Sequence, residues 1–294
     1  MGMAELQTQW QKWKPIVTAL GMTFLRRCKD DKITVSAGHL AYVSLLSLVP
    51  FIMVFFTLMS AFPAFGHARK KIEDFIFNNF VPASGDVVQN YIGEFVGNAS
   101  QMGAIGILSL LVVALLLISN VDKTLNAIWR TPSDRPLIYT FAIYWMVITL
   151  GPLLIGSSVV VSSYLIGLAA FAEEYTPGLG TFFLTLVPSL TSIAAYLILF
   201  MLVPNRRVRF VHALSGAILS TLLFELSKKG FSIYVTSFPS YELIYGALAV
   251  IPILFVWVYL SWIVVLLGAE FTCSVAETFE QQVTEEPRKI TTDE

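Results

Sequence analysis

Residues 224–273 read FELSKKGFSIYVTSFPSYELIYGALAVIPILFVWVYLSWIVVLLGAEFTC, and this stretch decides the fold. From residue 243 to residue 270 it is almost uninterrupted apolar sequence, about 28 residues long, whereas about 20 such residues match the hydrocarbon thickness of a bilayer. A water-soluble domain has no use for so long an apolar run. We therefore predict a membrane protein.

The composition of the whole chain favours the same class. Hydrophobic residues make up 56% and charged residues 13%, whereas soluble proteins carry roughly 25% charged residues. The net charge of -1 carries no information about nucleic-acid or acidic partners, so the positions of the charges matter more than their sum. Both cysteines, Cys28 and Cys273, fall on the side predicted below to be cytoplasmic, so we expect free thiols rather than a disulfide.

Five more apolar runs precede the quoted one, and each is interpreted as a membrane span. The six predicted spans cover residues 40–61, 103–119, 138–168, 181–203, 211 to at least 226, and 243–273. The predicted fold class is therefore all-α, a polytopic membrane protein with six transmembrane helices in a domain covering residues 38–273.

The N-terminal segment, residues 1–37, is too polar to span a membrane. Apolar residues recur in it at alternating spacings of three and four, which predicts one apolar stripe on a helix: Trp10, Trp13, Val17, Leu20 and Phe24. Basic residues are placed off that stripe: Lys12, Lys14, Arg26 and Arg27. This pattern is typical of a helix in the plane of the membrane interface. Packing against the rest of the protein is the alternative, and the two are compatible.

Two other polar segments complete the organisation. Residues 63–102 carry helical apolar spacings in two places, which predicts two amphipathic helices in a first periplasmic loop. Residues 274–294 are acidic and lack apolar periodicity, so we expect a disordered cytoplasmic tail.

Lysine and arginine positions predict the orientation, because short cytoplasmic loops are enriched in them. With six spans, both termini share one side. That side holds about fourteen of the 19 basic residues, whereas the other side keeps five: Arg69, Lys70, Lys71, Lys228 and Lys229. We expect both termini to face the cytoplasm of a bacterial inner membrane.

Several stretches resemble the YihY/BrkB family of bacterial inner-membrane proteins. They are AGHLAYVSLLSLVP at 37–50, LNAIW at 125–129, YWM at 144–146, KKGF at 228–231, FPSY at 238–241 and IYGALAVIP at 244–252. The resemblance covers about residues 31–270. It implies a six-span membrane protein and supplies no catalytic residues. Some family members carry a virulence or serum-resistance label, and the family once carried a tRNA-processing ribonuclease label.

One candidate substrate or ion site involves charges in the fifth span. Glu225 lies three and four residues before Lys228 and Lys229, so these side chains face one another on a helix. Such intramembrane charges indicate a functional site by default. The alternative is that the lysines extend to the outer interface and anchor the helix. Tyr241 and Tyr245 flank the next span and join the candidate site, although an interfacial aromatic belt explains them equally.

A second candidate is an ion-pair gate at the cytoplasmic ends of the spans. Asp122 and Glu270 lie near the inner ends of the second and sixth spans, and Arg206 and Arg207 lie in a neighbouring loop. Interfacial charges that hold helix ends are the commoner arrangement and remain the alternative.

No enzyme motif supports a catalytic interpretation. The three histidines, His39, His67 and His212, match no metal-ligand spacing, and no phosphate-binding loop or nucleophile motif occurs. We expect no enzyme activity, cofactor, metal or nucleic-acid partner, and therefore no ribonuclease. The leading hypothesis is a transporter or flippase-like protein with membrane lipids around it and a lipid or amphiphilic anion as substrate. The alternative is a structural scaffold of the envelope.

Overall fold

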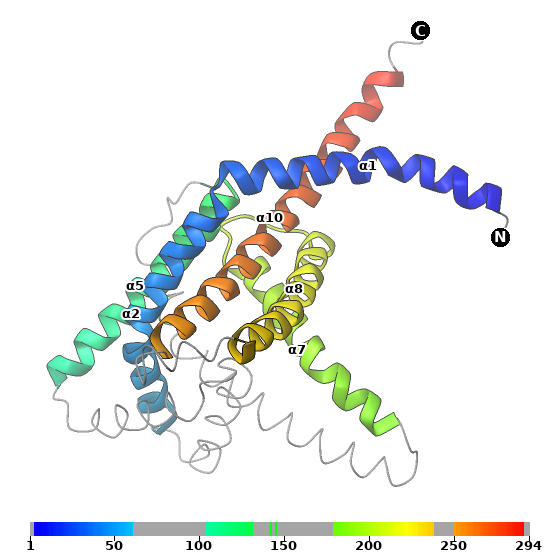
Figure 1. The fold of residues 1–294 in the computed structure, drawn as a ribbon. Helices are drawn as coiled ribbons and strands as arrows, with labels where there is room; N and C mark the ends of the chain where they lie inside the picture. The colour runs from blue at the N-terminus through cyan, green and yellow to red at the C-terminus, as the bar shows by residue number, and fades with distance from the viewer. Residues whose placement is uncertain are drawn as a thin grey trace.

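The structure is a computed structural model that describes residues 3–60, 104–131, 142, 145, 179–237 and 250–290. Its helices are α1 (Met3–Asp30), α2 (Ile33–Ser60), α5 (Ala104–Ile128), α7 (Leu179–Leu202), α8 (Phe210–Ser237) and α10 (Val250–Ile290) (Figure 1). No strand occurs in these ranges, so the all-α prediction is confirmed for them. The predicted third span and the two loop helices at 63–102 lie outside the described residues, apart from Ala142 and Trp145.

Two of these helices have the length and composition of membrane spans. They are Phe210–Ser237, which is the whole of α8, and Pro252–Glu280 within α10. Shorter apolar segments occur at Ile33–Ser47 in α2 and Ser189–Leu202 in α7. The membrane class therefore agrees with the structure, whereas the count of six spans remains a prediction.

Large apolar side chains face outward along the helices, as lipid contact requires. On α5 they follow one face at intervals of four residues, namely Leu108, Val112 and Leu116, and on α8 they include Ile218, Leu222 and Leu226. Water-soluble monomers rarely expose large contiguous apolar surfaces. These faces are what a bilayer would cover.

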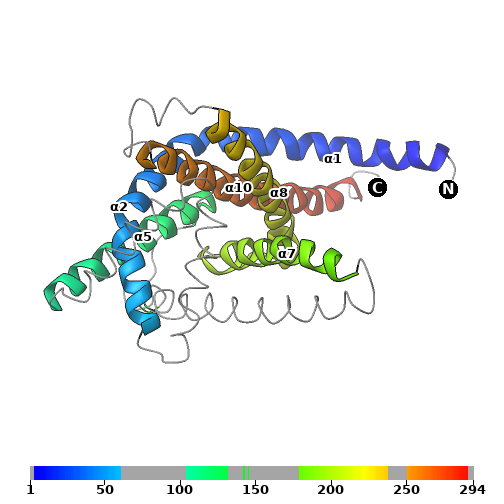
Figure 2. The same ribbon diagram turned by 60° about the horizontal axis from the view of Figure 1, so that its bottom comes forward.

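Helix α10 is the central element. It packs against α8, α2, α1 and α5, while α2 pairs with α5 and α7 pairs with α8. Figures 1 and 2 show α2 with α5 on one flank of α10 and α8 with α7 on the other. The buried core therefore combines residues of several helices, including Leu40 of α2, Leu125 of α5, Phe200 of α7 and Leu266 of α10.

Glycines allow α8 and α10 to approach closely. A Cβ atom built on Gly268 of α10 would lie 1.7 Å from Oγ of Ser220, and one built on Gly216 of α8 would lie 1.9 Å from Oγ1 of Thr272. Ser220, which faces Gly268, lies four residues after Gly216 on α8. Thr272, which faces Gly216, lies four residues after Gly268 on α10. This is the small-residue interface by which membrane helices pack without large side chains between them.

Two predicted boundaries are wrong. The N-terminal segment was expected to reach residue 37 as one unit, but α1 ends at Asp30 and α2 begins at Ile33. Between them Lys32 adopts a left-handed backbone conformation with φ of 47°, which ends a helix. The tail expected to be disordered from residue 274 instead continues α10 as a helix to Ile290, and Ser274, Val275 and Thr278 are buried.

Candidate functional site

A pair of opposite charges lies in the middle of α8. Lys228 Nζ is 2.7 Å from Oε1 of Glu225, one helical turn away, as the sequence predicted. The two side chains are 29% and 37% exposed, so the pair is neither sealed in the core nor free in solvent. Because α8 rises about 1.5 Å per residue, Glu225 lies about 22 Å from the start of the helix at Phe210.

Aromatic rings surround one side of this pair. The Lys228 ammonium lies over the ring of Phe224, 5.4 Å from its centroid. Phe224 packs edge-on against Tyr196 of α7 and tilted against Trp257 of α10, with centroid distances of 6.4 and 5.8 Å. The charge pair therefore rests on an apolar wall built by α7, α8 and α10, while both charged side chains stay partly exposed.

The remaining residues predicted for this site are distributed differently. Lys229 is exposed, and Glu225 forms its ion pair with Lys228. Tyr241 and Tyr245 lie outside the described residues.

A second charged cluster is buried where α1, α5 and α10 meet. Arg27 of α1 donates from Nε to Oε2 of Glu270 at 2.8 Å. It also donates from Nη1 to Oε1 of Glu277, which lies about two helical turns further along α10. The side chain of Arg27 is 5% exposed and that of Glu270 is fully buried. Burial opposes the guanidinium charge, but Glu270, Cys273 and Glu277 together outweigh it and raise the pKa of Arg27. Arg27 is therefore charged.

The same guanidinium closes the end of α5. Its Nη2 donates to the carbonyl oxygen of Ile128 at 2.6 Å. At this helix end Arg130 has a φ of 48°, its N–H donates to the Ala127 carbonyl, and the Thr131 N–H donates to the Asn126 carbonyl. That is the Schellman arrangement, in which carbonyls of the last turn are satisfied by the residues that follow. Arg27 supplies the donor for one carbonyl that the turn leaves over.

Three of the four predicted gate residues contact partners outside the predicted set. Glu270 pairs with Arg27 rather than with an arginine of the 203–209 loop. Arg206 instead reaches Glu280, 3.1 Å away in an exposed pair, and Arg207 is exposed. Asp122 accepts a hydrogen bond from Nδ2 of Asn126 on its own helix at 2.9 Å. The prediction of helix-end charges that hold elements together describes this arrangement better than a four-residue gate.

Arg27 was missed, although the sequence contained a signal for it. The apolar spacing predicts a stripe on α1 that ends at Phe24, with Arg27 off it. Arg27 is three residues after Phe24 and therefore continues the same face, on which Phe24 packs edge-on against Phe271 of α10 at 5.8 Å. A charge on the continuation of a buried face predicts a buried partner.

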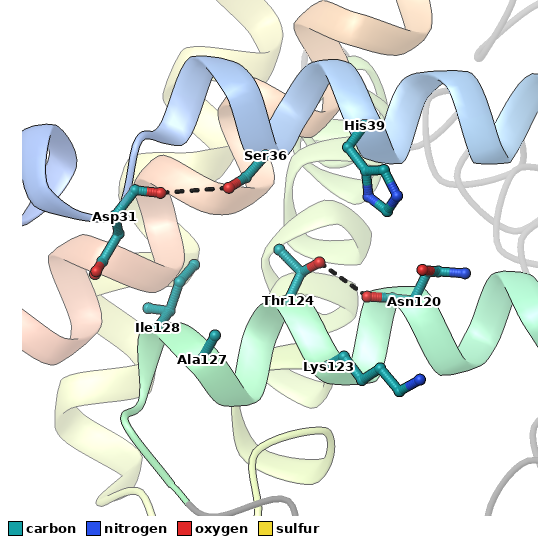
Figure 3. Close-up of a pocket in the computed structure, with 8 residues that line it drawn as sticks. All are labelled: Asp31, Ser36, His39, Asn120, Lys123, Thr124, Ala127 and Ile128. Atoms are coloured by element: carbon teal, nitrogen blue, oxygen red, sulfur yellow. Dashed lines mark hydrogen bonds between the residues drawn. The ribbon is translucent and has the colours of Figure 1, made fainter.

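One pocket is formed between α2 and α5. It has a volume of about 320 Å³, and Asp31, Ser36, His39, Asn120, Lys123, Thr124, Ala127 and Ile128 line it. Figure 3 shows His39 projecting from α2 toward the polar side chains of α5. Asp31, at the mouth, is paired with Arg130 at 3.2 Å. Six of these eight lining residues are polar, and the pocket is separate from the Glu225 pair on α8.

Metal-ligating side chains do not converge in the described part of the chain: no group of three or more His, Cys, Asp or Glu residues there has the arrangement of a metal site. Both cysteines occur as free thiols, with Cys273 buried.

Comparison with known proteins adds the family. The model of the family described as "Virulence factor BrkB" matches residues 24–291. The chain is 68% identical to a UPF0761 membrane protein of Alteromonas mediterranea, with 99% of each chain covered. It is 62% identical to a UPF0761 membrane protein of Pseudoalteromonas atlantica, over 97% of this chain and 95% of that one. A UPF0761 membrane protein of Vibrio parahaemolyticus is 48% identical, over 90% and 84%. No solved structure matches significantly.

Proposed function

The chain belongs to the BrkB family of membrane proteins, and from its charged α8 helix we propose that it is a flippase-like transporter of a lipid or an amphiphilic anion. The proposal is for a non-enzymatic protein of the bacterial inner membrane.

The Glu225–Lys228 pair carries this proposal. Both charges lie about halfway along a helix of 28 residues, which is about 42 Å long. A charge at the centre of a membrane helix costs about 2.5–3.5 kcal/mol on insertion scales, so such residues are rare unless they meet a polar partner. Pairing lowers that cost but leaves both side chains about a third exposed. A polar surface of this kind, beside an aromatic wall, suits a substrate with a charged head and an apolar body.

The buried cluster around Arg27 supports a second element of the proposal. It joins α1, α5 and α10 at one end of the bundle, whereas the Glu225 pair lies on the α8 flank. A transporter needs one end closed while the site is open to the other side. We propose that the Arg27 cluster is that closure.

The orientation is part of the same proposal, with both termini in the cytoplasm. The asymmetry of basic residues supports it. Arg27 and Glu277 contact one another, which supports a common side for the end of α1 and the distal part of α10. Cysteines introduced at the exposed residues Lys14 and Glu280 should react with an impermeant thiol reagent only after spheroplasts are permeabilised. Labelling of either cysteine in intact spheroplasts would reverse the orientation.

Liposomes containing the purified chain test the transport proposal. The assay measures scrambling of a fluorescent anionic lipid and uptake of an amphiphilic anion. Glu225→Gln and Lys228→Gln should each lower the flux at least about tenfold, because either change leaves one charge unpaired at the site. Lys229→Gln is the matched control, since Lys229 is exposed and next in sequence, and it should keep the parental flux.

A charge exchange separates function from folding. The double variant Glu225→Lys with Lys228→Glu keeps an ion pair, so it should fold as well as the parent while its flux differs. Equal flux from the parent and from empty vesicles would refute transport of the compounds tried and favour the envelope scaffold.

A further inference from the structure

The pocket between α2 and α5 lies at the end of an exposed apolar seam. On α5 the outward residues Leu108, Val112 and Leu116 precede the pocket residue Lys123 on nearly the same face. On α2 the exposed residues Tyr42 and Leu46 follow the pocket residue His39 at spacings of three and seven. Two lines of apolar side chains therefore lead away from one polar pocket.

The seam is long enough to cover one leaflet. Lys123 and Leu108 are separated by about 22 Å along the α5 axis, whereas half of the hydrocarbon core measures about 15 Å. Lys123 lies in the last two turns of α5, and Asp31 at the pocket mouth lies just before α2 begins. The polar pocket is thus at the helix ends, where headgroups would lie, and the apolar seam extends from it past the middle of α5 to Leu108.

The charges that line the pocket favour an anion. The only acidic side chain that lines it, Asp31, is engaged by the guanidinium of Arg130 through both carboxylate oxygens, at 3.2 and 3.3 Å. No acidic partner pairs with Lys123 in the part of the chain that the structure describes. Lys123 of α5 and His39 of α2 are therefore the lining residues left to donate to an anion. In Figure 3 His39 points toward α5, whereas the Lys123 side chain extends along α5 on the side away from His39.

We propose that this pocket and the seam bind one anionic phospholipid, with its phosphate at Lys123, its headgroup in the pocket beside His39, and an acyl chain along Leu116, Val112 and Leu108. The volume of about 320 Å³ holds a headgroup, and the seam holds the chain outside it. The site is distinct from the Glu225 pair, because α10 separates the α2–α5 flank from the α8 flank (Figure 1). Lipid binding here does not depend on transport and would remain if the transport proposal failed.

The test is isothermal titration of the full chain in a neutral detergent with dihexanoyl phosphatidylglycerol. Dihexanoyl phosphatidylcholine and glycerol phosphate are titrated in parallel. We expect saturable binding of phosphatidylglycerol that is tighter than binding of either other compound. Lys123→Met should weaken this binding about fivefold, since one basic residue near an anionic headgroup is worth about 1 kcal/mol.

Matched variants make the result specific. Lys123→Arg should keep the affinity, and Lys29→Met, which removes an exposed lysine of α1 outside the pocket, should leave it unchanged. His39→Gln gives an independent measurement from the other helix. Leu116→Ser should weaken phosphatidylglycerol binding without changing that of glycerol phosphate.

Three outcomes would overturn the inference. One is no saturable binding of phosphatidylglycerol by a folded parent protein. Another is parental affinity in both Lys123→Met and His39→Gln, with thermal unfolding used to show that each variant folds. The third is binding of glycerol phosphate as tightly as the lipid, which would identify a site for a free anion.

Discussion

Replacing Arg27 by methionine should destabilise the protein more than any exposed charge substitution. The change removes the only guanidinium that the described residues place against Glu270, whose side chain is fully buried. Breaking a buried ion pair on one side typically costs about 3–5 kcal/mol, because the remaining charge stays desolvated without a partner. Glu277 is 36% exposed and can turn toward water, so most of the loss should come from Glu270.

A double variant distinguishes an unpaired charge from lost packing. Arg27→Met with Glu270→Leu removes both buried charges, and apolar replacements of buried pairs are often neutral or stabilising. We expect the double variant to recover at least about 2 kcal/mol relative to Arg27→Met alone. Both variants lack the hydrogen bond from Arg27 to the Ile128 carbonyl, and this loss should cost about 1 kcal/mol in each.

The measurement is reversible unfolding of the purified chain in mixed micelles, with free energies taken for the parent, both single variants and the double variant. Arg206→Met is the matched control, because its pair with Glu280 is exposed on both sides and such pairs contribute about 0–1 kcal/mol. The reasoning is refuted if Arg27→Met is no more destabilised than Arg206→Met, or if the Arg27 and Glu270 effects simply add.

Two further predictions concern helix packing and thiol chemistry. Gly268→Leu should destabilise the protein by about 1–3 kcal/mol, because a side chain there meets Ser220 across the α8–α10 contact. Gly21→Ala should be neutral or stabilising, because nothing lies within 4 Å of the new Cβ. Equal unfolding free energies for the two variants would contradict this account of the packing. Burial, with the charges of Glu270 and Asp31, raises the pKa of Cys28 to about 11, so its maleimide labelling should be slow at neutral pH and rise about tenfold per pH unit up to pH 10. Glu270→Gln removes one of those charges and should speed labelling at pH 8, and an unchanged rate would contradict this account.

The helices that the sequence predicted best are those defined by local apolar content. Residues 181–203 correspond to α7 at Leu179–Leu202, and the predicted start at residue 211 lies next to the start of α8 at Phe210. Helical ends were less predictable. The predicted end of the second span at 119 lies nine residues before Ile128, because polar residues of α5 continue the helix where other helices pack on it.

The tail after residue 273 illustrates the same limit. Its acidic composition predicted disorder, but Thr278 is buried and Glu277 and Glu280 receive arginines from α1 and the 203–209 loop. Partners far away in sequence supplied the order that composition did not indicate.

For the candidate site, the sequence alone determined the pair within α8, because residues three apart on one helix must face each other whatever surrounds them. It also determined the membrane class, since apolar run length is a property of the chain itself. Only the tertiary structure decided that Glu270 meets Arg27, 243 positions earlier, and that Lys123 and His39 line one pocket. The physical reason is that helix periodicity fixes which face a side chain occupies, whereas packing between helices decides what that face meets.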